Sequence, residues 1–259
     1  MKSVWLNRFL FVLGIWLLTN HSFAQTKMQM LNNKLFRGSF YYDKQDFSKA
    51  KGEFEEALQI DSNYAPAYEY LGLIYTNLEQ NDSALIFFKK LLTLIPGQVN
   101  CYLYVGKAYD QLELFDSAIF YYTIAINMDA GCADCWQARG FTYLKMGKYN
   151  ESLSDVNTGI EYDSLDCYSR NCRGLANFYL GNYIEAMKDY HKSLTLNYKN
   201  EYTYFIYNNM GNCYLAMKKM DEACRYWKLA IESGYVYLEE YKRHYNFEDP
   251  KDLLKKYCP

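Results

Sequence analysis

The amino-acid sequence predicts an all-α fold built from about six stacked helical hairpins, on the basis of three recurring features. Six glycines recur every 34 residues, with a last step of 37. A small residue follows each glycine twelve positions later, and in five of the six cases a good N-capping residue follows ten positions later. Because glycine inside a helix costs about 1 kcal/mol relative to alanine, the series indicates places where two helices pack closely. The glycines are Gly38, Gly72, Gly106, Gly140, Gly174 and Gly211; the small residues are Ala50, Ala84, Ala118, Ser152, Ala186 and Ala223; the expected caps are Ser48, Asp82, Asp116, Asn150 and Asp221.

Residues 1–24 read as a secretory signal peptide. Lys2 and Arg8 precede an apolar run at 9–18, and Ser22 and Ala24 supply the small residues of a cleavage site. The run of ten apolar residues is half the roughly 20 that a membrane-spanning helix needs, which disfavours an uncleaved anchor. We therefore expect cleavage after Ala24, no stable membrane insertion of the mature chain, and export to the periplasm or the medium of a bacterial host. Residues 25–30 would then form a short lead before the first hairpin.

The repeats follow as six units within residues 31–237. The units are 31–64, 65–98, 99–132, 133–166, 167–200 and 204–237. The second unit shows the shared pattern most fully, with Tyr68, Leu71, Gly72, Tyr75, Ala84, Phe88, Leu91 and Pro96. This pattern resembles that of the tetratricopeptide repeat family, and the six units cover about four fifths of the chain. The resemblance implies a right-handed α-solenoid whose first helices line a concave groove that holds a peptide or another protein.

Two units depart from the family's pattern. Arg139 and Arg173 stand where leucine is typical. The fifth unit also has Asn177 in place of the tyrosine and Ile184 in place of the cap. We therefore expect the fifth unit to be the least well packed.

The family's inward-facing positions, transferred to this chain, give a candidate partner-binding groove. Its apolar residues are Phe141, Leu144, Leu175, Phe178 and Tyr179, and its polar residues include Lys107, Gln137 and Asn171. The apolar residues would form one patch for contact with a partner. The alternative is that the chain itself covers this inner face.

Eight cysteines lie beyond the expected cleavage site, and an even number in an exported chain favours disulfides. Cys213 and Cys224 lie on either side of the last hairpin's turn, and we expect them to pair. Four more begin the first helices of the fourth and fifth units: Cys132, Cys135, Cys167 and Cys172. A disulfide that joins these units is favoured, with a four-cysteine zinc site, a redox Cys132–Cys135 motif and buried free thiols as alternatives.

Residues 238–259 are expected to form a helical cap over the open end of the solenoid. Asp249 and Pro250 are typical of an N-cap and a first helical residue, and a short helix is expected over 253–257. The segment is similar to closing segments of exported repeat proteins that carry a terminal cysteine. That similarity implies that Cys258 could form a disulfide that joins the cap to the last hairpin. Such a bond would compete with the Cys213–Cys224 pair.

Composition and motifs argue against nucleic-acid binding and catalysis. The net charge is −2, and the lysines alternate with acids along the helices without forming a basic stripe. The mature chain keeps only His191 and His244, with no metal-ligand spacing and no serine nucleophile motif, so we expect no metal and no cofactor. We predict a non-enzymatic scaffold that binds a protein or peptide. A carbohydrate-binding envelope protein and a thiol-disulfide protein that uses Cys132 and Cys135 are the alternatives.

Overall fold

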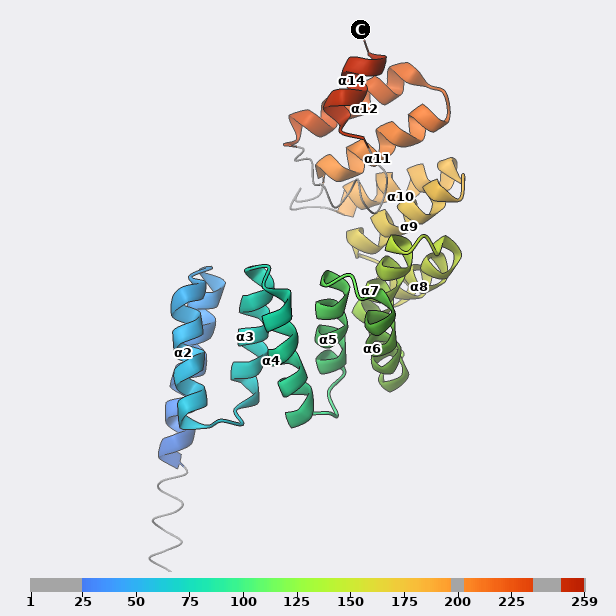
Figure 1. The fold of residues 1–259 in the computed structure, drawn as a ribbon. Coiled ribbons are helices and arrows are strands. Elements are labelled where there is room, and N and C mark those ends of the chain that lie inside the picture. The colour runs from blue at the N-terminus through green and yellow to red at the C-terminus, as the bar shows by residue number, and fades with distance from the viewer. Residues whose placement is uncertain (1–24, 197–202, 235–247, 259) are drawn as a thin grey trace, which may run out of the picture. The chain divides into compact units, whose positions relative to one another are not determined.

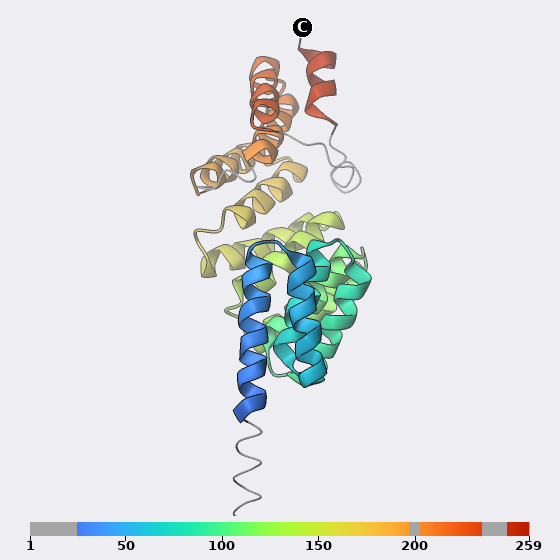
Figure 2. The same cartoon turned by 90° about the vertical axis from the view of Figure 1, so that its left-hand side faces the viewer.

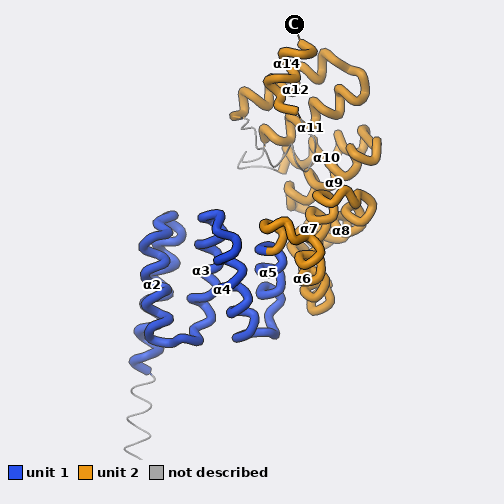
Figure 3. The backbone as a smooth tube through the Cα atoms, viewed as in Figure 1, with its two compact units in different colours: residues 1–108 blue, residues 109–259 orange. Residues whose placement is uncertain are grey.

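The computed structural model describes residues 25–196, 203–234 and 248–258, and its regular elements are all helices (Figure 1). The expected signal peptide, residues 1–24, lies outside the described residues. The chain divides into two compact units, residues 1–108 and 109–259 (Figure 3). The paired helix-turn-helix packing confirms the predicted all-α class.

The first unit begins with a helical stretch over residues 25–43. The helices α2 (Phe47–Ile60), α3 (Ala65–Asn77) and α4 (Asn81–Leu94) follow, then most of α5 (Val99–Gln111). Neighbouring helices pack together along the chain, α2 with α3 and α3 with α4. Their core contains Leu31, Phe54, Leu71 and Ile74.

The second unit continues with α6 (Phe115–Met128), α7 (Ala133–Lys145), α8 (Tyr149–Tyr162), α9 (Cys167–Tyr179), α10 (Tyr183–Leu196), α11 (Thr203–Ala216), α12 (Met220–Glu232) and α14 (Pro250–Tyr257). Helices α7 and α8, α9 and α10, and α11 and α12 form successive antiparallel hairpins (Figures 1 and 2). The first helices of the hairpins also contact one another, α7 with α9 and α9 with α11. These contacts create one continuous face of first helices within the unit.

The repeated glycines make room for the large residue that follows sixteen positions later. A Cβ atom added at Gly38, Gly174 or Gly211 would lie 2.5 Å from the ring of Phe54, Tyr190 or Trp227. Gly72 faces Phe88 in the same way. At Gly140 the facing residue is the smaller Val156, and the added Cβ would lie 2.9 Å from its Cγ1. At these five positions the glycine therefore lets a side chain of the second helix lie directly against the backbone of the first.

The turns inside the hairpins correct the expected helix starts. The second helices begin two residues earlier than predicted, so that Ser48 and Asp82 lie in the first turn and do not cap it. The turn needs a left-handed residue just before the helix, such as Gln45 at φ 59° or Gly181 at φ 81°. Its closing bond runs from the amide of Asp46 to the carbonyl of Tyr41 at 2.9 Å. Because this bond closes the turn tightly, the loop between the two helices of a hairpin is shorter than the capping residues predicted.

The C-terminal helix α14 packs against α12 as a cap. Asp249 accepts a hydrogen bond from the amide of Lys251 at 2.8 Å, and Pro250 is the first helical residue, as the sequence predicts. Leu253 is 3% exposed and packs against Ala223 and Trp227. The predicted stretch 238–247 lies outside the described residues. None of the described helices is both long and apolar enough to cross a bilayer.

Candidate binding surface

The apolar groove residues predicted from the sequence lie around one cluster on α7 and α9. Leu144 and Leu175 are each 1% exposed, so they form part of the core and cannot contact a partner directly. Phe141, Phe178 and Tyr179 pack onto the same cluster and are only partly buried. We call these three residues the aromatic patch. The surface that a partner could reach is therefore smaller than the sequence suggests.

Aromatic contacts hold the patch in place. Phe141 lies 5.4 Å from the ring of Tyr168, and Tyr179 stacks on Tyr149 with their centroids 4.8 Å apart. Phe178 packs edge-on against Tyr179 at 5.2 Å. Burial raises the pKa of Tyr179 well above its ordinary value, so its phenol stays neutral throughout the physiological range. The patch is a preformed, uncharged aromatic surface.

A buried charge pair borders the patch. The ammonium group of Lys145 lies 5.1 Å from the centre of the Phe141 ring and 2.8 Å from Asp110 Oδ2. The side chains of Lys145 and Asp110 are only 4% and 9% exposed. The hydroxyl of Thr142 donates to the other carboxylate oxygen of Asp110 at 2.7 Å. Because both charges are satisfied within the protein, this pair fixes the edge of the patch and is not free to bind a partner's charge.

The predicted polar groove residues have different surroundings. Gln137 donates to Asp166 at 2.8 Å, and Asn171 accepts from Asn209 at 3.1 Å while being 8% exposed. Lys107 is an exposed residue of the first unit. Gln137 thus contacts the N-cap residue of α9, and Asn171 contacts the sixth repeat.

Helix α11 carries buried asparagines that sequence reasoning missed. Asn208, Asn209 and Asn212 are at most 7% exposed. Asn212 accepts from the indole of Trp227 at 3.2 Å, whereas both polar atoms of the Asn208 amide are buried and have no hydrogen-bond partner among the described residues. The only sequence signal is their recurrence along one helix.

The cysteine pairing differs from the prediction. Cys224 pairs with Cys258, with Cα atoms 5.9 Å apart, and Cys213 is a buried free thiol, so the expected Cys213–Cys224 bridge is wrong. Cys213 faces the core of its hairpin, where it packs near Tyr190 and Met210, whereas Cys224 lies on the side of α12 that meets α14. The disulfide therefore ties the cap to the last hairpin, the alternative that the sequence left open.

The second group of cysteines also pairs differently. Cys132 and Cys135 form a disulfide within the first turn of α7, with Cα atoms 5.3 Å apart. Because Cys132 and Cys135 bond to each other and Cys172 is a free thiol, the expected bridge between the fourth and fifth units is wrong. The thiol of Cys172 is buried beside Ser152, and burial raises its pKa to about 12. Among the described residues, no group of side chains forms a metal site.

Comparison with known proteins identifies the repeats. The model of the tetratricopeptide repeat family matches residues 33–64, 65–98, 133–164 and 206–233. The chain is a tetratricopeptide repeat protein. No curated protein matches the sequence significantly.

Solved structures share the fold of this tetratricopeptide repeat protein at low sequence identity. The APC/C hetero-tetramer Cut9-Hcn1 superimposes with a TM-score of 0.77 and 16% identity over 88% of this chain, which spans 43% of that chain. PilF of Pseudomonas aeruginosa gives a TM-score of 0.70 with 13% identity, covering 89% of this chain and 98% of that chain. The type IV pilus biogenesis factor PilW gives 0.71 with 18% identity, covering 82% and 96%. At these identities the likeness establishes the fold alone.

Three of the tetratricopeptide repeats replace an apolar contact inside the hairpin by an ion pair. Arg139 binds Asp155 through two hydrogen bonds of 2.7 and 2.9 Å, and Arg173 binds Asp189 likewise. Arg37 and Glu53 form the same pair in the first repeat at 2.6 Å. The sequence analysis noted Arg139 and Arg173 but missed Arg37 and all three acidic partners. The sequence contains a signal for these pairs, because each acid follows its arginine by sixteen positions. Leu71 and Phe87 have the same spacing in the second repeat.

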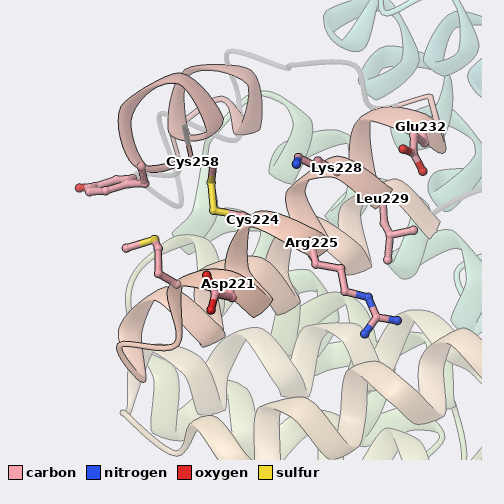
Figure 4. A pocket seen from close by; sticks show the side chains of 9 residues that line it. Asp221, Cys224, Arg225, Lys228, Leu229, Glu232 and Cys258 are labelled. Atoms are coloured by element: carbon pink, nitrogen blue, oxygen red, sulfur yellow. A yellow bond between two sulfur atoms is a disulfide. The ribbon is translucent and has the colours of Figure 1, made fainter.

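Two pockets of this tetratricopeptide repeat protein are lined by described residues of the second unit. The first, of about 520 Å³, lies between α12 and α14 beside the Cys224–Cys258 disulfide (Figure 4). Its charged residues, Asp221, Arg225, Lys228 and Glu232, balance one another. The second, of about 530 Å³, is lined by α8, α9 and α10 and carries four basic residues against two acids. We call this second pocket the cationic pocket; its basic residues are Arg170, Arg173, Lys188 and Lys192.

Proposed function

We propose that this protein is an exported, non-enzymatic scaffold that holds a segment of a partner protein against the aromatic patch. Tetratricopeptide repeat proteins generally act as scaffolds for protein–protein interaction. The observation that supports the patch as the contact site is the partial exposure of Phe141, Phe178 and Tyr179 on adjacent first helices. One structural neighbour, YrrB, is described as a tetratricopeptide repeat protein with an unusual peptide-binding site.

The patch favours an apolar segment as its ligand. Phe141 and Phe178 offer ring faces without a free charge beside them, since Lys145 is already paired with Asp110. Aromatic residues on a rigid framework are typical binding hot spots, where truncation of one residue costs about 2 kcal/mol or more. We expect a partner residue such as leucine or phenylalanine to rest between these rings.

Peptide display against residues 25–259 tests this proposal. A selected peptide should bind the wild-type protein and lose at least about tenfold in affinity on Phe141→Ala combined with Phe178→Ala. Phe120→Ala is the matched control, because Phe120 is a phenylalanine of the same unit that is 59% exposed on the second helix α6. Equal loss in both variants, or no loss in either, would refute the patch as the site.

Export is the second part of the proposal. Lys2, Arg8 and the apolar run support a signal peptide, and the two cysteine pairs at bonding distance suit an oxidising compartment. Fractionation of the native host followed by N-terminal sequencing tests it. A cytoplasmic protein that retains Met1 would contradict export, whereas a mature chain that begins at Gln25 would support it.

A second candidate function is thiol-disulfide exchange, and the Cys132–Cys135 disulfide is the observation that favours it. The sulfur of Cys132 accepts a hydrogen bond from the amide of Cys135 at 3.2 Å at the start of α7, an arrangement that stabilises a thiolate. Cys135 is fully buried, so only Cys132 could be attacked by an incoming thiol. Equilibration of the protein with glutathione buffers of graded potential tests this. A bond that stays oxidised below about −300 mV would be structural.

A further inference from the structure

The cationic pocket lies where the fifth repeat lacks the tyrosine that is typical of the family. In the second, third and sixth repeats the tyrosine at the equivalent position stacks on an aromatic ring of the second helix, as Tyr75 does on Phe87 with centroids 5.2 Å apart. The fifth repeat has Asn177 at that position and Asp189 opposite. The shorter side chains leave space that the rings fill elsewhere, and both residues line the pocket.

The charges of the pocket are only partly neutralised by the protein. Arg173 is held by Asp189 and donates to Asn157 at 2.9 Å, and Lys188 pairs with Glu185 at 2.6 Å. These pairs account for both acids that line the pocket.

Arg170 and Lys192 remain without a carboxylate partner among the described residues. The guanidinium of Arg170 donates one hydrogen bond, from Nη2 to the carbonyl of Ser164 at 2.9 Å. Its Nε is buried and has no hydrogen-bond partner in the part of the chain that the structure describes. Arginine carries five N–H donors, so most of the binding capacity of this group is unused within the described protein.

We propose that the cationic pocket is a second binding site of this protein, one that takes a carboxylate or phosphate anion between Arg170 and Lys192. A cavity of about 530 Å³ is in the range of small-molecule sites, so it can admit a small organic anion or the acidic side chain of a peptide. Arginine binds either anion through paired, charge-assisted hydrogen bonds, and lysine adds a second positive charge. The balanced pocket beside α14 lacks this excess of positive charge.

Isothermal titration calorimetry of residues 25–259 with three probes tests the site: inorganic phosphate, citrate and a hexaglutamate peptide. We expect at least one probe to bind with a millimolar or tighter constant, more weakly as salt is added. Binding of phosphate or citrate would identify a free anion as the ligand, and binding of the peptide alone would identify an acidic segment. The absence of binding by all three would overturn the proposal.

Two variants locate the bound anion. Arg170→Gln combined with Lys192→Gln should weaken binding at least about tenfold. Asn177→Tyr restores the residue typical of the family and should fill the pocket without unfolding the hairpin, because Tyr143 lies beside the equivalent Arg139–Asp155 pair in the fourth repeat. Arg225→Gln combined with Lys228→Gln removes two exposed charges from the other pocket and is the control. Unchanged binding in both pocket variants, with circular dichroism showing intact helices, would place the anion elsewhere and refute the site.

Discussion

The buried Arg139–Asp155 ion pair yields a prediction that separates charge burial from packing. The two side chains are 14% and 6% exposed, and Arg139 also donates to Thr123 at 3.0 Å. Arg139→Leu leaves Asp155 buried without its partner, which should lower the free energy of unfolding by about 3–5 kcal/mol. Adding Asp155→Phe recreates the Leu71 and Phe87 combination of the second repeat. The double variant should recover most of that loss, because an apolar pair of similar volume is often as stable as a buried ion pair.

Urea unfolding followed by circular dichroism measures this, with both single variants and the double variant forming a thermodynamic cycle. Arg37→Leu is the internal control. Arg37 is 51% exposed in the same type of pair, and Glu53 keeps a second contact with Lys34, so this change should cost no more than about 1 kcal/mol. A loss below about 1 kcal/mol for Arg139→Leu, or a double variant no more stable than that single variant, would refute the reasoning.

Four further predictions follow from packing and thiol burial. Gly174→Ala should destabilise the fifth repeat by about 1–3 kcal/mol in thermal unfolding, since the new Cβ would lie 2.5 Å from the Tyr190 ring; a loss below about 0.5 kcal/mol would contradict this fit. Cys258→Ser should release α14, because a helix of eight residues is not stable alone, and amide exchange over 250–257 should then speed up strongly; unchanged protection would show that Leu253 packing suffices. Burial raises the pKa of Cys172 and Cys213 to about 12, so both should resist iodoacetamide at pH 8 in the native protein and react in urea. The stability linked to these raised pKa values is fully present below about pH 9 and is lost as the pH rises toward 12, which alkaline denaturation can follow.

The sequence predicted the hairpins well because their packing rule is local and repeated. Gly38 and Phe54 stand sixteen residues apart in one hairpin, and the same spacing recurs along the chain. The turns were predicted less accurately, since left-handed residues such as Glu79 and Lys218 carry no sequence signature comparable to glycine. Capping residues therefore suggested helix starts two residues too late.

The cysteines and the groove depended on information that a repeat pattern does not contain. Cys224 can reach Cys258 only because α14 folds back onto α12, a contact between the solenoid and its cap. Leu144 and Leu175 occupy inward-facing positions of the family but are covered by their neighbours in the same cluster. Position in a repeat thus predicts which face a side chain lies on, and its exposure depends on the residues packed around it.

Site-specific photocrosslinking in the native host tests the central claim most directly. A photoreactive phenylalanine analogue at position 178 should crosslink one partner protein, and mass spectrometry of the product should show a segment rich in apolar residues. The same analogue at position 120, on an exposed second helix, should give no such product. Crosslinks of equal yield from both positions, or from position 120 alone, would contradict binding at the aromatic patch.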